Sequence, residues 1–178
     1  MVNAIRQGDR IEKVTIIRNG PGANAFKADQ AAFDALLEEA ASADSARTRA
    51  KRDADIAQIN RKYPSAVLTP SGLRYLILKK GNGVKPVPGK TVAVNYKGMF
   101  LSGEVFDSSD ILGGPLEFQA GAGRVIPGWE ATVLGMEQGE KRLVIIPPEL
   151  AYGDQGAGNG AIPGNTFLVF EMELVRIR

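Results

Sequence analysis

Hydrophobic and polar residues alternate along several segments in the second half of the chain, and this period of two is typical of half-buried β-strands. Segment 166–177 shows the pattern best, with apolar residues on one face and glutamates on the other. The apolar face consists of Leu168, Phe170, Met172 and Leu174. The pattern predicts strands over 73–79, 91–100, 140–146 and 166–177.

A short apolar segment, 127–135, interrupts these strands. It begins with proline and ends with glycine, which are the residues favoured at the start and just past the end of a helix. Several strands with one short helix indicate an α+β fold, in which an antiparallel β-sheet curls around a short α-helix.

The preceding segment, 23–63, has a helical period and contains neither glycine nor proline. Its apolar residues recur at helical spacing in two groups, Phe26, Phe33, Leu36, Leu37 and Ala40, then Ile56, Ile59 and Tyr63. We predict one long N-terminal helix or a helical hairpin that stops at Pro64. Between the groups, 41–54 has only alanine as an apolar residue, so weak packing is expected there.

These changes in composition and periodicity divide the chain into three parts. Residues 1–22 form a strand-like segment closed by a Gly/Pro turn, 23–68 a helical linker, and 69–178 the main domain. The linker is a candidate dimerisation segment, which makes a homodimer through the N-terminal helix one expected assembly. Its basic run, 47–52, fits a solvated helix face better than a docking site for an anionic partner.

The composition narrows the chemistry. The chain has no cysteine and no histidine, which excludes a thiolate nucleophile, a Ser-His-Asp triad and nearly every transition-metal site. We therefore expect no metal and no cofactor, and chemistry that breaks no covalent bond. A net charge of +2 gives no reason to expect nucleic acid or a membrane as partner. No secretory signal is visible, so a cytoplasmic location is expected, or a periplasmic one if a leader was removed.

A set of short motifs in the main domain resembles the FKBP-type peptidyl-prolyl cis–trans isomerases. Any one of them is a weak signal, because aromatic residues on strands are more often core residues. Together they follow the family's order and near-family spacing over about 110 residues. The motifs are the segments 92–99, 103–109, 125–130, 150–153, 162–163 and 168–171.

The resemblance implies a proline-binding pocket. Trp129 matches the indole floor, Asp107 the carboxylate near the twisted amide, and Ile162 the loop that overhangs the site. Tyr152 and the backbone N–H of Ile126 match the groups that hydrogen-bond the carbonyls of the peptide or inhibitor. Asp107, Tyr152, Phe106 and Ile126 are thus the expected catalytic residues. The walls match Tyr96, Phe106, Val125, Ile126 and Phe170.

Two departures from the family pattern bear on ligand preference. Leu116 stands where many members carry a wall phenylalanine, and the overhanging loop 161–164 begins with the small Ala161. Both residues are smaller than the usual ones, so the rim of the pocket is expected to be looser. We expect isomerase activity towards proline-containing proteins and peptides, and macrolide inhibitors such as rapamycin as candidate ligands. The alternatives are a peptide-binding or chaperone module of the same fold with little turnover.

Residues 2–18 resemble a different prolyl isomerase, the C-terminal end of a bacterial cyclophilin. They match its last helix end, turn and closing strand, a segment too short to contain cyclophilin catalytic residues. This suggests a cyclophilin–FKBP fusion, and a coincidental strand motif is the alternative.

Overall fold

The computed structural model describes residues 30–178. The strand-like segment 1–22, with its cyclophilin resemblance, lies outside the described residues. The chain divides into two compact units, one ending at Ser45 and one spanning Ala46–Arg178, and each is described by itself.

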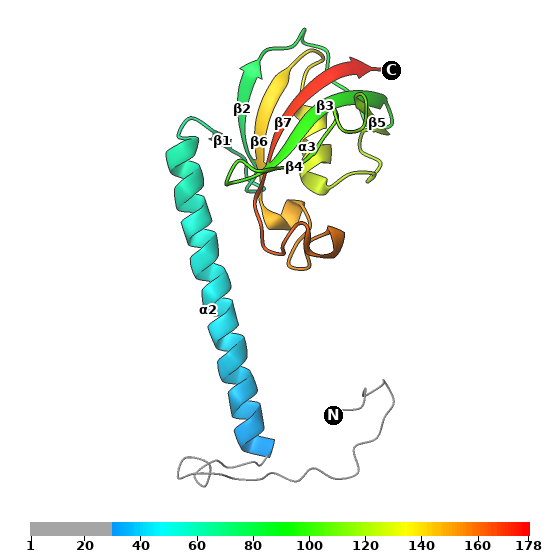
Figure 1. Ribbon diagram of the computed structural model, residues 1–178. Coiled ribbons are helices and arrows are strands. Elements are labelled where there is room, and N and C mark those ends of the chain that lie inside the picture. The colour runs from blue at the N-terminus through cyan, green and yellow to red at the C-terminus, as the bar shows by residue number, and fades with distance from the viewer. Residues whose placement is uncertain (1–29) are drawn as a thin grey trace, which may run out of the picture. The chain divides into compact units, whose positions relative to one another are not determined.

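The larger unit is built on a seven-stranded antiparallel sheet, as the alternating pattern predicted (Figure 1). The strand order is β1-β2-β6-β7-β3-β4, and β5 also pairs with β3. The strands are β1 (Val67–Leu68), β2 (Arg74–Lys79), β3 (Thr91–Phe100), β4 (Val105–Ser108), β5 (Leu116–Gln119), β6 (Lys141–Ile146) and β7 (Leu168–Ile177). The four predicted strands are confirmed to within two residues at each end, whereas β1, β4 and β5 were not predicted.

One face of the sheet packs against the short helix α3 (Pro127–Gly135), whose predicted bounds are confirmed. Val133 of α3 and Met136 just after it are fully buried against inward-facing residues of β3 and β7. Gly128 allows the close approach, because a Cβ there would lie 2.4 Å from a side-chain atom of Ile146. The predicted curling of a sheet around one short helix is confirmed.

The opposite face of the sheet is covered by the end of helix α2 (Gln30–Lys62). Ile59 is fully buried there, together with Leu143 and Ile145 of β6, Phe167 and Val169. Burial on both faces explains why the last four residues of β6, 143–146, are all apolar. The structure places 46–62 in the same compact unit as the sheet, whereas the sequence interpretation had begun the main domain at residue 69.

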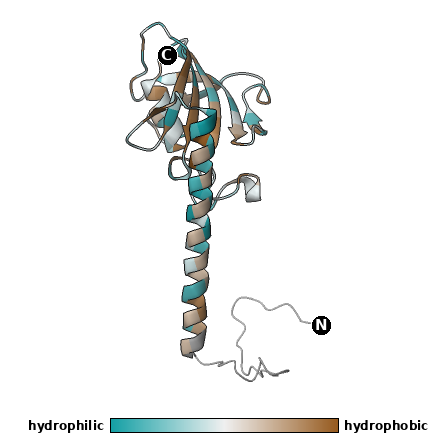
Figure 2. Cartoon of the chain, turned by 90° about the vertical axis from the view of Figure 1, so that its left-hand side faces the viewer, coloured by the Kyte–Doolittle hydropathy of each residue, from teal (hydrophilic) through white to brown (hydrophobic). Residues whose placement is uncertain are grey.

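Helix α2 is continuous over its described length, so the long-helix alternative holds there and the hairpin does not. It ends at Lys62, two residues before Pro64, where the sequence predicted the stop. Hydrophobic colour concentrates on the strands in Figure 2, while α2 alternates between hydrophilic and weakly hydrophobic residues. Residues 41–47 are all exposed, in agreement with the weak packing expected. No helix within residues 30–178 has the length and apolarity that a membrane span requires.

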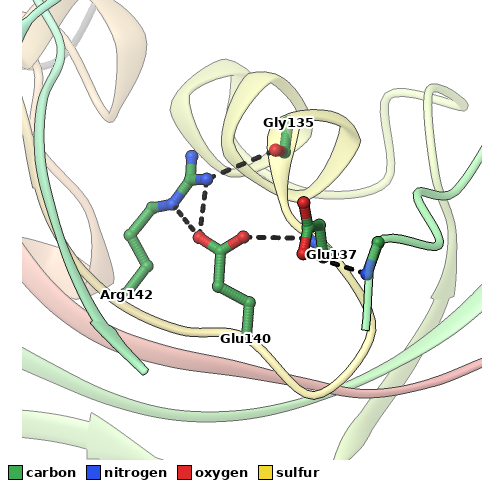
Figure 3. A network of polar contacts seen from close by, with 5 residues as sticks. Gly135, Glu137, Glu140 and Arg142 are labelled. Atoms are coloured by element: carbon green, nitrogen blue, oxygen red, sulfur yellow. Dashed lines mark hydrogen bonds and ion pairs between the residues drawn. The ribbon is translucent and has the colours of Figure 1, made fainter. Parts of the chain in front are cut away.

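A buried polar network joins the end of α3 to β6 (Figure 3). Glu140 accepts hydrogen bonds from the Arg142 Nε at 2.6 Å and from the Glu137 N–H at 3.0 Å. Arg142 also donates to the Gly135 carbonyl at 3.3 Å, and its guanidinium lies 4.4 Å from the centre of the Tyr75 ring. The Glu140 and Arg142 side chains are only 4% and 9% exposed, so each charge is stabilised in the interior by the opposite charge of its partner.

We expect Arg142→Ala to destabilise the fold by about 3–5 kcal/mol, because it leaves Glu140 charged, buried and unpaired. The matched control is Arg176→Ala, which breaks an ion pair with Glu117 whose side chains are 45% and 44% exposed. That change should cost about 1 kcal/mol or less. Chemical denaturation measures both values, and equal losses in the two variants would contradict the argument.

Candidate functional site

A cavity of about 410 Å³ opens beside the N-terminal end of α3. Its walls come from β3, β4, β5, β7 and the segment 124–126, so the sheet order assembles residues that are distant in the chain. It is lined by Tyr96, Phe106, Asp107, Leu116, Arg124, Val125, Ile126, Trp129, Tyr152 and Phe170.

The structure therefore brings together every predicted site residue except Ile162. That residue is half-buried and packs against the core, and its backbone exchanges hydrogen bonds of 2.9 and 3.0 Å with Ala157. The pairing closes the loop on itself, and Ile162 is not among the residues that line the cavity, so its place in a loop over the site stays a prediction. Conversely, Arg124 lines it and was not predicted. Its place directly before Val125 and Ile126 was the available signal.

An aromatic cluster forms the floor. The Trp129 indole is 4% exposed, and the Tyr96 and Phe170 rings meet it nearly edge-on, with centroids 4.8 and 5.3 Å away. Phe106 packs edge-on to Phe170 at 5.7 Å and extends the apolar surface. The indole N–H is buried and finds no hydrogen-bond acceptor within residues 30–178. Edge-to-face packing holds the rings of the floor in fixed positions and leaves a mainly apolar surface.

Gly98 of β3 is needed for this cluster, although its role was not predicted. A Cβ at this position would lie 2.8 Å from a ring atom of Phe106 and 2.9 Å from one of Phe170. Both rings occupy the space that any other side chain would fill. A glycine inside a strand often marks such a close approach, which is the signal the sequence offered.

Asp107 is the anionic group of the cavity, and both of its oxygens are engaged. The Tyr96 hydroxyl donates to Oδ2 at 2.7 Å, and the Ser108 N–H donates to Oδ1 at 2.8 Å. Burial, followed by the hydrogen bond to Asp107, raises the pKa of Tyr96 well above its usual value. Burial and the charge of Asp107 also raise the pKa of Tyr152. Both phenols therefore remain protonated at neutral pH.

Two hydrogen-bond donors remain open to a ligand. The Tyr152 hydroxyl belongs to a residue that is 38% exposed and bonds to no other residue within 30–178. The Ile126 N–H, at the residue that precedes α3, likewise donates to no acceptor in the described chain. The cavity thus combines an apolar floor with donors suited to carbonyl oxygens. Within residues 30–178, no group of acidic side chains could hold a metal ion.

Comparison with known proteins agrees with this geometry. The family model described as FKBP-type peptidyl-prolyl cis-trans isomerase matches residues 82–175. FK506-binding protein 2 of Dictyostelium discoideum is 52% identical over 94 residues, which are 53% of this chain and 70% of that protein. Outer membrane protein MIP of Legionella longbeachae is 39% identical over 130 residues, or 73% and 54% of the two chains. The crystal structure of FkpA from Escherichia coli is similar with a TM-score of 0.66 and 35% identity, covering 83% and 68%.

We expect Gly98→Ala to destabilise the fold by about 1–3 kcal/mol, because the new methyl group overpacks against Phe106 and Phe170. The fluorescence of Trp129 should change as well, since Phe170 packs directly on the indole. Gly114→Ala is the matched control: its Cβ meets no atom within 4 Å and its φ is not positive. Denaturation and emission spectra test both variants, and an unaltered Gly98→Ala protein would show that the rings can move aside.

Proposed function

Because the chain belongs to the FKBP-type peptidyl-prolyl cis–trans isomerase family, we propose that the cavity over Trp129 is where it accelerates rotation about X–Pro bonds. The observation that carries this assignment is the apolar floor combined with open donors from Tyr152 and Ile126. The isomerase activity itself follows from the family match and the relatives.

The reaction suits an apolar enclosure. Rotation about a peptide bond has a barrier of ~18–20 kcal/mol, because it breaks amide resonance. For X–Pro bonds the isomers lie within about 1 kcal/mol of each other, yet exchange takes tens of seconds or longer. The twisted amide is less dipolar than the planar one. A dry cavity therefore destabilises the ground state more than the transition state, which lowers the barrier without proton transfer.

The open hydrogen-bond donors would orient the peptide within the cavity. The Tyr152 hydroxyl and the Ile126 N–H would hold the carbonyl groups on either side of the proline, while the ring rests on Trp129. Asp107 fixes the Tyr96 hydroxyl and places a negative charge beside the site. Such fixed groups cost no reorganisation when the amide twists.

The same cavity is proposed to admit macrolides, since its relatives are named FK506-binding proteins. Rapamycin-type ligands would fill the space over Trp129 and compete with peptides. Residues 2–18 are proposed, on their sequence alone, to correspond to the C-terminal end of a cyclophilin, from its last helix end through a turn to its closing strand. A binding module with little turnover is the alternative that the following variants test.

We expect Asp107→Asn and Phe106→Ala each to lower kcat/KM by about tenfold or more, equivalent to about 1.4 kcal/mol. The first removes a charge-assisted hydrogen bond, and the second removes part of the apolar wall. A protease-coupled assay with proline peptides measures the rates. Asp110→Asn, an identical change at an exposed residue, is the control. Wild-type rates in folded Asp107→Asn and Phe106→Ala proteins would show that the site lies elsewhere.

The exposed start of α2 supports a separate proposal, a homodimer. Phe33, Leu36 and Leu37 follow helical spacing and are 57%, 49% and 53% exposed. A second copy brings an identical stripe, which makes it the simplest apolar partner.

Light scattering should give twice the chain mass for the wild-type protein and the single-chain mass for Leu36→Ser/Leu37→Ser. Leu78→Ser, at a residue of β2 that is 51% exposed, should not change the mass. A monomeric wild-type protein would end this proposal and leave the isomerase assignment intact.

A further inference from the structure

Among the residues that line the cavity, Arg124 carries a cationic side chain. Arg124 is exposed and stands directly before Val125 and Ile126, which form part of the wall. Its guanidinium makes no hydrogen bond or ion pair with a residue of the described chain. A free arginine beside an apolar site offers several N–H donors and a positive charge to whatever enters.

The backbone of Arg124 is held in place beside the cavity. Glu130 of α3 accepts hydrogen bonds from the Gly121 N–H at 2.6 Å and the Arg124 N–H at 3.2 Å. This carboxylate is therefore engaged by the backbone of the turn and not by the guanidinium. The arrangement fixes where the side chain starts and leaves its end free.

The anion of the cavity does not neutralise Arg124 either. Both oxygens of Asp107 accept hydrogen bonds, one from the Tyr96 hydroxyl and one from the Ser108 N–H. The cavity therefore contains one engaged negative charge and one unengaged positive charge. A ligand that supplies a carboxylate would pair with the unengaged positive charge.

We propose that Arg124 makes the site select proline segments with an acidic residue directly beside the proline. This inference rests on the isomerase assignment of the cavity. Apolar walls alone would favour apolar neighbours of the proline, and the arginine adds a preference that the apolar walls cannot provide. The carboxylate takes no part in breaking the amide resonance, so we expect it to act mainly on KM.

The test uses two sets of tetrapeptides that differ only beside the proline. One set places Glu, Gln or Leu before the proline, and the other places Glu or Gln after it. In at least one set, wild-type kcat/KM should be about two- to fivefold higher for Glu than for Gln, the range of an exposed ion pair. In Arg124→Gln the ratio should fall to about one, and in Arg124→Glu it should invert.

The matched control is Arg61→Gln, the same change at an exposed arginine in the last turn of α2. It should keep the wild-type ratio. Added salt should reduce the ratio in the wild-type protein and have no effect on it in Arg124→Gln. A Glu/Gln ratio that is the same in wild type and Arg124→Gln, in both sets, would overturn the inference. The Leu peptides separate this failure from a failure of the site, since they report isomerisation without any carboxylate.

Discussion

The burial of the Trp129 indole is the contact on which the rest of the structure depends. Three aromatic rings surround it, from β3, β5 and β7, and each can reach it only if the sheet curls over the start of α3. Two glycines make that approach sterically feasible. Gly128 lets α3 lie against Ile146, and Gly98 leaves room for Phe106 and Phe170. The fold and the floor of the cavity are thus consequences of the same packing.

Packing on both faces of the sheet stabilises this arrangement. The inner face packs on α3, and the outer face packs on Ile59 near the end of α2. The Glu140–Arg142 pair fixes the other end of α3 to β6, far along the helix from Trp129. A helix held at both ends can present Ile126 and Trp129 at a fixed distance from β3 and β7, which a catalyst without a covalent step requires.

Long alternating segments made most of the sheet predictable, and the helix bounds followed from Pro127 and Gly135. The short strands β1, β4 and β5 were missed because two to four residues carry too little periodicity. Ile59 was read as part of a linker, since its partner strand β6 lies more than 80 positions further along the chain. Site residues were found where motifs contain them. The roles of Gly98, which lies within motif 92–99, and of Arg124 were missed. The space that a glycine leaves free and a charge without a partner can be recognised only from the neighbouring side chains in the structure.

The balance of donors and acceptors in the cavity explains why proline suits it. Three donors of the cavity engage no residue of the described chain, namely the Ile126 N–H, the Tyr152 hydroxyl and the Arg124 guanidinium, while Asp107 already accepts two hydrogen bonds. An ordinary peptide segment would bring an N–H for each residue and leave donors unsatisfied in an apolar space. Proline has no N–H, so the segment around it presents carbonyl acceptors in excess. We therefore expect the cavity to favour proline by hydrogen bonding as well as by the shape of its aromatic floor, and the same open donors can bind a carboxylate.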